Sequence, residues 1–272
     1  MTDTANKARP VVIKLGGSCL ANLAEEWWGD LADLAHDRPA VLVHGWSKQL
    51  RSHDPRHRSE SAILRDRYGN QSRWTTDEVI HDIKTVSTEV AAGVRDRLGR
   101  RGVNVSRALG SDGLVHAGEA ERWWWRGKEL VELDNRVGPI ERVDISPLRD
   151  VRPGHVYLVT PLARNTRGIE VNTDADRAAA AVAAAIGASD LILVTDVAHL
   201  LIDGRAVHHI TRTAAANFRD KGATGGMRKK LRAATEALDQ GVDRVTLGSA
   251  TVSDLLHART GTTIVANTEV NA

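Results

Sequence analysis

The stretch Val11-Val12-Ile13-Lys14-Leu15-Gly16-Gly17-Ser18 is an apolar run that stops abruptly at two glycines. A second apolar run, from Ala40 to Val43, stops in the same way at His44-Gly45-Trp46-Ser47, and a helix is expected between the two from about Leu23 to Ala35. Short buried strands that alternate with helices and end in glycine-rich turns are typical of a parallel sheet. The stretch therefore predicts an α/β fold.

The same alternation continues along the chain. Apolar spacing and capping residues predict strands at 156–159, 190–194 and 244–247, and helices at 77–100, 174–186, 226–239 and 252–258. Asp203-Gly204 is typical of a hairpin turn. Residues 103–137 alternate and turn repeatedly, which predicts hairpins that project from the sheet.

Composition narrows the class of protein. The chain has 272 residues, of which 42% are hydrophobic and 26% charged, with a formal net charge of +2. These values are ordinary for a globular protein and too mild for a nucleic-acid partner. The N-terminus lacks the apolar core of a signal peptide, no apolar run is long enough to span a membrane, and the single cysteine, Cys19, excludes an internal disulfide. We therefore expect a cytoplasmic protein with no membrane span.

Lys14-Leu15-Gly16-Gly17-Ser18 is the first candidate for chemistry. It places a lysine in a buried strand just before two glycines, where the backbone can approach phosphate oxygens. A tight strand-to-helix turn with a lysine reaching toward solvent explains the same residues equally well. Neither a Walker pattern nor a dinucleotide-binding glycine pattern occurs in the sequence.

Two helix starts add further charged residues. Asn172-Thr173-Asp174-Ala175-Asp176 opens an alanine-rich helix, and its two carboxylates, two residues apart, do not share a helix face. Thr224-Gly225-Gly226-Met227-Arg228-Lys229-Lys230 brings cations to a helix N-terminus, where they oppose the helix dipole unless an anion lies nearby. The alternatives are a simple complement to the dipole for the first segment and a solvated basic face for the second.

These segments, in this order, resemble the amino-acid kinase superfamily, and within it the acetylglutamate kinase branch. The resemblance rests on 11–18, 42–47, 72–75, 171–188, 193–201 and 225–238, and covers nearly the whole chain. It implies a three-layer αβα sandwich with a mainly parallel central sheet and two lobes. Residues 1–160 would form the phospho-acceptor lobe with a projecting basic hairpin, and residues 161–272 the ATP-binding lobe.

The resemblance also implies roles for single residues. Lys14 and Lys230 match the transition-state lysines, Asp176 matches the aspartate that holds them, and Arg73 and Asn172 match the pair that grips the substrate. The loop Gly45, Trp46 and Ser47 would contact the acceptor. The residues expected at the nucleotide are Gly16, Gly17, Asp196, Val197, Leu200, Leu201, Gly222 and Thr224. ATP and Mg²⁺ are the implied cofactors, with the ion held mainly by phosphates and water, so no metal ligands are expected from the protein.

Within the branch, the chain is most similar to kinases of the amino-group carrier protein pathways. These kinases phosphorylate the side-chain carboxylate of a 2-aminoadipyl or glutamyl unit attached to a small acidic carrier. The form of residues 172–174 and 44–47 favours this group, and an acidic carrier would suit the basic residues Arg56, Arg58, Arg122, Arg126 and Lys128. The alternative is that these residues are solvated loop charges. The resemblance further implies a homodimer formed through the helix at 77–100 and its neighbouring strand.

The sequence departs from the family pattern at three places. Trp46 and His199 replace glycines, and Trp123-Trp124-Trp125 is an unusual run. The Trp46 indole must either reshape the acceptor pocket or point away and pack on a partner, and either glycine replacement could mark altered acyl specificity or a regulatory relative. We expect at least one tryptophan of the run to be exposed and available to a partner.

Three functions remain to be separated. The first is a carrier-dependent acyl kinase that forms an acyl phosphate, a reaction that needs no general base because the carboxylate is already ionised. The second is an acetylglutamate kinase that acts on the free small molecule. The third is a non-catalytic regulatory member of the fold, which the joint presence of Lys14, Asp176 and Lys230 argues against.

Overall fold

A single eight-stranded sheet forms the centre of the computed structural model, which describes residues 8–20, 22–66, 71–126, 128–148 and 150–267, without the side chain of Arg126. In spatial order its strands are β16 (His209–Thr211), β18 (Thr262–Val265), β17 (Arg244–Gly248), β13 (Asp190–Val194), β1 (Val11–Leu15), β2 (Ala40–His44), β10 (His155–Thr160) and β5 (Asn104–Leu109). All neighbours are parallel except β17 and β18. The carboxyl ends of β1, β2, β10 and β13 therefore meet at one edge.

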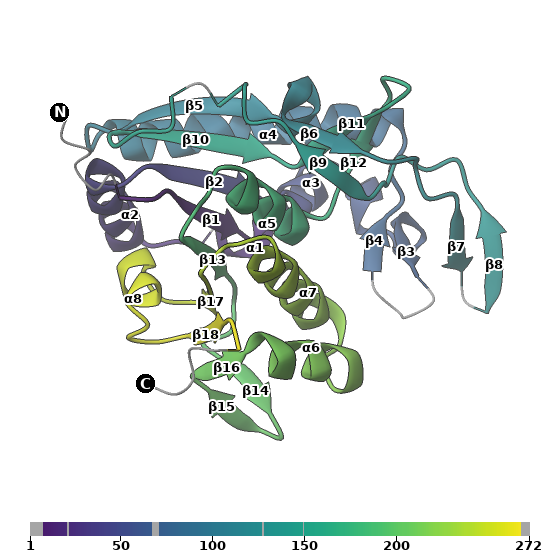
Figure 1. Cartoon of the computed structure of the whole chain (residues 1–272). Coiled ribbons are helices and arrows are strands. Elements are labelled where there is room, and N and C mark those ends of the chain that lie inside the picture. Colours follow the sequence, from purple (N-terminus) through teal and green to yellow (C-terminus); the bar gives the residue numbers. More distant parts are fainter. Residues whose placement is uncertain (1–7, 21, 67–70, 127, 149, 268–272) are drawn as a thin grey trace.

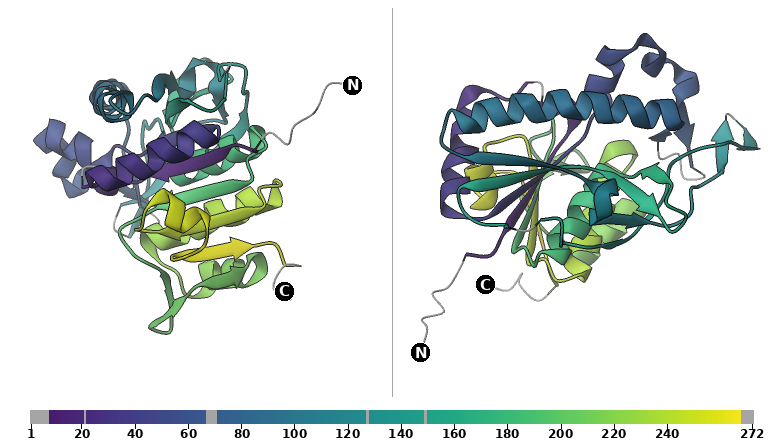
Figure 2. Two further views of the ribbon diagram at one scale, coloured as in Figure 1. Left: turned by 90° about the vertical axis from the view of Figure 1, so that its left-hand side faces the viewer. Right: turned by 90° about the horizontal axis from the view of Figure 1, so that it is seen from above.

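Helices cover both faces of this sheet (Figures 1 and 2). One face packs against α2 (Glu25–Asp37), α4 (Asp77–Gly99) and α8 (Val252–Leu256). The other packs against α5 (Ala175–Ala185), α6 (Arg212–Lys221) and α7 (Gly225–Asp239). This arrangement is the three-layer sandwich that the sequence predicts.

The alternation of side chains along β1 determines on which face of the sheet Lys14 lies. Val11, Ile13 and Leu15 lie in the core on the α2 side, whereas Val12 lies in the core on the α5 side. Side chains alternate along a strand, so Lys14 points to the same side as Val12, toward α5 and α7.

Helix α5 can lie close to β1 and β2 because its inner surface consists of alanines. Ala178, Ala179 and Ala183 are fully buried there. Its first turn is fixed by Asp174, whose Oδ1 accepts the backbone N–H groups of Asp176 (3.0 Å) and Arg177 (3.1 Å). Asp174 is thus the cap of the helix, and the two carboxylates of this turn do point to different partners, as expected.

Three smaller sheets lie around the central one. They are β12 (Glu170–Asn172), β11 (Leu162–Asn165), β6 (Val115–Ala117) and β9 (Ile140–Val143); β14 (Leu200–Ile202) with β15 (Arg205–Val207); and β4 (Gln71–Arg73), β3 (Ile63–Arg65), β7 (Trp123–Arg126) and β8 (Glu129–Glu132). The hairpin of β7 and β8 stands away from the body at the right of Figure 1. Short helical segments complete the chain: α1 (Gly17–Leu20), α3 (Ser47–His53), Pro55–Arg58, Glu60–Ala62 and the π-helical Gly110–Leu114.

Most predicted elements are present, with two differences. Residues 103–137 do not all form projecting hairpins, because β5 joins the central sheet as its edge strand and only β7 and β8 project. The sequence analysis also missed α6, β16 and β18. The predicted lobe boundary after residue 160 falls within one continuous sheet, with β1, β2, β5 and β10 before it and β13, β16, β17 and β18 after it. Among the described residues, no helix is both long and apolar enough to cross a membrane.

Candidate active site

Two lysines from distant parts of the chain share one carboxylate. Nζ of Lys14 lies 2.8 Å from Oδ1 of Asp176, and Nζ of Lys230 lies 3.1 Å from Oδ2 of the same residue. The side chains of Lys14, Asp176 and Lys230 are 8%, 7% and 13% exposed. The cluster carries two positive charges and one negative charge, so it retains one uncompensated positive charge at the edge where strands end.

Three elements bring this cluster together. Lys14 comes from β1, Asp176 from the first turn of α5, and Lys230 from the start of α7. The neighbouring Lys229 pairs with Asp174, at 3.2 Å. Asp174 and Asp176 therefore supply the negative charges that are expected beside the basic start of α7.

The mutual attraction of these groups controls their protonation. Burial alone would raise the pKa of Asp176, but the charges of Lys14 and Lys230 outweigh it and hold the pKa well below its usual range. Burial alone would lower the pKa of Lys14, but the charge and the hydrogen bond of Asp176 outweigh it and the pKa is raised. Lys14 and Asp176 are therefore both ionised at neutral pH.

The loops that follow β1 and β2 touch at two glycines. A Cβ atom on Gly17 would lie 2.9 Å from the backbone nitrogen of Ser47, and one on Gly45 would lie 2.9 Å from the backbone nitrogen of Gly17. Both obstacles are backbone atoms and cannot swing aside. Glycine at these two positions thus lets the two loops pack edge to edge beside Lys14.

His44 anchors the end of β2 to the end of β10. It is fully buried, and its Nε2 lies 3.0 Å from Oγ1 of Thr160 at the end of β10. Burial lowers the pKa of His44 to about 4, so the imidazole is neutral at neutral pH. His44 therefore holds the Gly45-Trp46-Ser47 loop in place and does not reach the reaction centre as a base.

A cavity of about 1280 Å³ opens above the cluster. Of the residues predicted for catalysis and substrate binding, it is lined by Lys14, Gly45, Trp46, Ser47, Arg73, Asn172 and Asp176. Lys230 reaches this group through its bond to Asp176 and is not itself part of the lining. Lys14 and Gly17, residues 45–47, Arg73 and residues 172–176, far apart in sequence, thus meet at one cavity.

Arg73 and Asn172 are buried polar residues that line the cavity, and each has one buried side-chain atom without a partner among the described residues. Arg73 is 7% exposed and donates from Nη1 to the backbone oxygen of His57 (3.1 Å), while its Nε has no partner among the described residues. Asn172 is 5% exposed and donates from Nδ2 to Oγ1 of Thr75 (3.2 Å), while its Oδ1 has no partner among them. Buried polar atoms are rarely left without partners, so these two atoms are suited to a polar ligand.

Trp46 does not point away toward a partner. Its indole is 7% exposed and packs in a small core with Leu50, Ile80, Ile83 and Leu162, while the residue also forms part of the cavity wall. The indole that Trp46 adds to the loop therefore packs inside the protein, against α3 and α4.

The residues predicted at the nucleotide lie apart from this cavity, except Gly17. Asp196 and Val197 are exposed in the turn after β13, Leu200 is buried and Leu201 exposed in β14. Gly222 and Thr224 lie between α6 and α7, and the cavity reaches the neighbouring Arg219, Asp220, Gly225 and Gly226. Gly16 lies behind the lining, in contact with Cys19. The nucleotide assignments stay predictions.

Three of the five residues predicted to contact a carrier already have partners within the chain. Arg56 is paired with Asp82 on α4, and Arg58 donates to the backbone oxygen of Arg51 (2.8 Å). Arg122 pairs with Glu132 across the projecting hairpin (2.9 Å). Lys128 is exposed at its turn, and the Arg126 side chain lies outside the described part of the chain.

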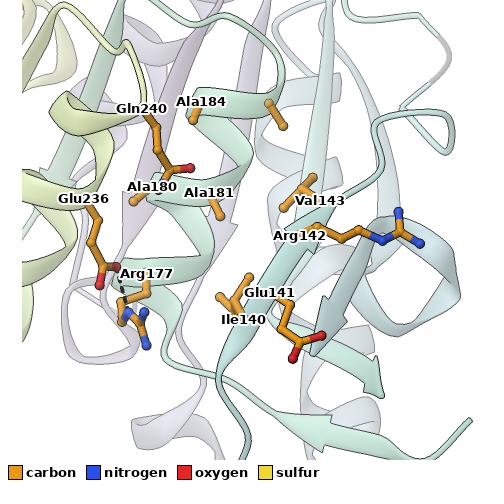
Figure 3. Close-up of a pocket in the computed structure, with 11 residues that line it drawn as sticks. Ile140, Glu141, Arg142, Val143, Arg177, Ala180, Ala181, Ala184, Glu236 and Gln240 are labelled. Carbon is orange, nitrogen blue, oxygen red and sulfur yellow. Dashed lines mark hydrogen bonds and ion pairs between the residues drawn. The ribbon is translucent and has the colours of Figure 1, made fainter. Parts of the chain in front are cut away.

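A second cavity of about 550 Å³ adjoins the first, between β9 and α5 (Figure 3). The two share Ile140, Arg177 and Glu236 in their linings, and Arg177 and Glu236 form an ion pair at 2.7 Å. Ala180, Ala181 and Ala184 form its floor. The sequence analysis missed Arg177 and Glu236, because they are 59 residues apart in sequence and only the packing of α5 against α7 brings them together.

A metal ion has no ready-made site in the described ranges. No group of three or more His, Cys, Asp or Glu side chains gathers there in a way that could hold one. Asp174 and Asp176, the carboxylates nearest the reaction centre, are both paired with lysines.

A search against protein families matches the amino acid kinase family model over residues 9–249. The chain belongs to the amino acid kinase family. This amino acid kinase is 31% identical to a protein of Aeropyrum pernix provisionally named LysW-aminoadipate/LysW-glutamate kinase, over 93% of this chain and 96% of that one. It is 30% identical to the acetylglutamate kinase of Brevibacillus brevis, over 96% and 97%.

Solved structures agree on the fold. The smu.665 protein of Streptococcus mutans superposes with a TM-score of 0.77 at 21% identity, covering 95% of this chain and 99% of that one. The carbamate kinase of Giardia lamblia superposes with a TM-score of 0.69 at 14% identity, covering 96% and 99%. The family and its fold confirm the expectation of a phosphotransferase with a carboxyl group as acceptor.

Proposed function

We propose that this kinase transfers the γ-phosphoryl group of ATP to the side-chain carboxylate of an aminoadipyl or glutamyl unit carried on an acidic amino-group carrier protein. The product is an acyl phosphate. The observation that carries the proposal is the sharing of Asp176 by Lys14 and Lys230, which aims two cations at one point. Phosphoryl transfer depends mainly on such positioned charge.

The residues of the cluster have separate tasks in this reaction. A carboxylate oxygen of the acceptor attacks the γ-phosphorus, and the bond from phosphorus to the β-bridging oxygen breaks, which releases ADP. Lys14 and Lys230 stabilise the negative charge on the migrating group, and Asp176 holds both ammonium groups in place. The acceptor is already ionised, so no side chain need remove a proton.

Arg73 and Asn172 are proposed to hold the acceptor. Arg73 and Asn172 line the same cavity, and the unpartnered Nε of Arg73 and Oδ1 of Asn172 leave a cationic donor and an acceptor unsatisfied just behind its surface. A guanidinium suits a carboxylate or a carbonyl, and an amide oxygen suits an N–H group. Mg²⁺ would come bound to the nucleotide, where it neutralises phosphate charge.

The shape of the cavity favours an acceptor attached to something larger. Pockets for small molecules commonly measure about 300–1,000 Å³. The main cavity here is about 1280 Å³, and it continues past the pair of Arg177 and Glu236 into the second cavity. The similarity to the Aeropyrum pernix protein supports the same acceptor. We also propose a homodimer formed through α4 and the edge strand β5.

A hydroxylamine trap tests the proposal. The enzyme is mixed with ATP, Mg²⁺, hydroxylamine and either LysW protein charged with 2-aminoadipate or free N-acetylglutamate, and hydroxamate is measured. We expect hydroxamate with the charged carrier. Turnover with N-acetylglutamate alone would instead establish the second candidate, which the 30% identity to the Brevibacillus brevis enzyme favours. ATP binding without turnover of either acceptor would indicate a regulatory protein.

A further inference from the structure

The two sides of the projecting hairpin β7–β8 differ in what they face. Trp124 is 3% exposed, donates from Nε1 to the backbone oxygen of Glu121 (2.6 Å) and lines the main cavity. Neighbouring side chains alternate along a strand, so Trp123 and Trp125 lie on the opposite side. One side of the hairpin therefore belongs to the reaction cavity, and the other faces outward.

The outward side is apolar. Trp123 is 61% exposed, Trp125 is 36% exposed, and Leu130, directly opposite Trp125 in the pairing with β8, is 50% exposed. We call Trp123, Trp125 and Leu130 the tryptophan face. Large apolar side chains grouped in this way on a surface mark an interaction site more often than they mark chance exposure. Tryptophan is also enriched among the residues that carry most of the binding energy of protein interfaces.

The rim of the tryptophan face is mainly basic. Arg65 of β3 is exposed and lies opposite Trp125, and Lys128 is exposed at the hairpin turn. On the acidic side, Glu132 is bound by Arg122, which leaves Glu129 as the exposed carboxylate of β8 with no ion pair among the described residues. An apolar centre with a basic rim suits a partner that has an apolar patch and an acidic surround.

We propose that the tryptophan face is the docking site of the acidic carrier protein, with the indoles of Trp123 and Trp125 as its anchors. This inference rests on the proposed function. Trp124, on the reverse side of the same strand, lines the cavity that holds Lys14 and Asp176. A carrier seated on the outward side thus lies beside the mouth through which its acyl group must enter. The basic residues steer the partner, and the indoles hold it.

The experiment compares three variants in the hydroxylamine trap with LysW protein charged with 2-aminoadipate. Trp123→Ser with Trp125→Ser removes both anchors, and Trp123→Phe with Trp125→Phe keeps most of their apolar area. Ile145→Ser is the matched control, because Ile145 is a 44% exposed apolar residue outside the hairpin. Each variant is also checked for its KM for ATP, its thermal unfolding and its mass in solution by light scattering.

We expect the double serine variant to raise the KM for the charged carrier by about tenfold or more, because interface tryptophans commonly act as anchors. Its kcat at saturating carrier and its KM for ATP stay at the wild-type values, since the tryptophan face does not touch the reacting groups. The double phenylalanine variant and the Ile145→Ser control remain close to wild type.

Three results would overturn the proposal. If wild type turns over the carrier and the double serine variant has the same KM, the docking site lies elsewhere while the proposed function stands. If wild type ignores the carrier and phosphorylates only the free acceptor, the proposed function fails and the inference fails with it. If the double serine variant changes mass from dimer to monomer, the tryptophan face binds a second copy of this chain.

Discussion

The Nζ atom of Lys14 lies 2.8 Å from Oδ1 of Asp176, and both side chains are buried. Lys230 occupies the other oxygen of the same carboxylate. A buried ion pair contributes little net stability, but the loss of one partner leaves a buried charge uncompensated. The arrangement therefore links the folding of this kinase to its proposed reaction, because the proposal assigns the same three groups to both.

Replacement of either lysine should abolish most activity. Lys14→Gln and Lys230→Gln each remove one cation from the migrating phosphoryl group, and we expect kcat to fall by about 10²–10³-fold, as for loss of a comparable transition-state donor. Hydroxamate formation at saturating ATP and acceptor measures the effect. Lys221→Gln, an exposed lysine at the end of α6, is the control and should retain wild-type kcat. Full activity in Lys14→Gln would contradict the assignment.

The stability contributed by Asp176 should depend on pH at the acid end. Its pKa in the folded protein lies below the ordinary value of 3.8, because of Lys14 and Lys230. The stabilisation is therefore complete above pH 3.8 and is lost as pH falls through the lower, folded pKa. Asp176→Asn lacks it at every pH, so the gap in unfolding free energy between wild type and variant should narrow below about pH 4. Urea unfolding between pH 2 and pH 7 measures the gap, and a constant gap would contradict the ion-pair explanation.

His44 should give evidence of the same sign, in a higher pH range. Its folded pKa is about 4, against an ordinary value of 6.5, so the unfolded chain binds a proton between these values and the folded chain does not. Wild-type stability should therefore rise with pH from about 4 to 6.5, by about 3 kcal/mol from this group. His44→Gln keeps a hydrogen bond to Thr160 within reach and should flatten that slope. Activity should show no step that follows the titration of His44, because the residue lies outside the cavity lining.

The structure brings Lys14, Asp176 and Lys230 together, and each of the three belongs to a local pattern in the sequence. Lys14 follows from an apolar run before two glycines, and Asp176 and Lys230 follow from charged helix starts that lacked a local explanation. The strand period then decides which side Lys14 faces, and that side is where the alanine-rich α5 packs.

Other features depend on contacts between distant segments, which a single sequence does not encode locally. Asn172 and Thr75 are 97 residues apart, and His44 and Thr160 are 116 residues apart. The sequence predicts a projecting hairpin where the edge strand β5 lies. Most side chains of β5 are half-buried, and this weakens the apolar pattern that marks a central strand. The sequence leaves the direction of the Trp46 side chain undecided for the same reason, because the packing of α3 and α4 determines it.

Gly45 should tolerate no side chain. In Gly45→Ala the new Cβ would lie 2.9 Å from the backbone nitrogen of Gly17, and backbone on both sides leaves little room to adjust. We expect a loss of about 1–3 kcal/mol in unfolding free energy, together with a lower kcat because the loop beside Lys14 shifts. Gly99→Ala is the control: nothing lies within 4 Å of its Cβ position, and it ends helix α4. That variant should be neutral or slightly stabilising in urea unfolding.

Trp46 is best tested by separating its size from its polar atom. Its indole fills the small core with Leu50, Ile80, Ile83 and Leu162, and its Nε1 is buried with no partner among the described residues. Trp46→Ala should therefore cost about 3–5 kcal/mol in unfolding free energy, because it leaves a cavity.

Trp46→Phe should cost less than about 1.5 kcal/mol, because it keeps much of the volume and removes an N–H group that gains nothing by burial. Urea unfolding measures both changes, and the KM for the acceptor measures whether the indole shapes the pocket. If packing is its role, Trp46→Phe keeps the wild-type KM. If Trp46→Phe instead changes the KM tenfold while stability stays constant, the indole selects the acyl group and its position in the core is secondary.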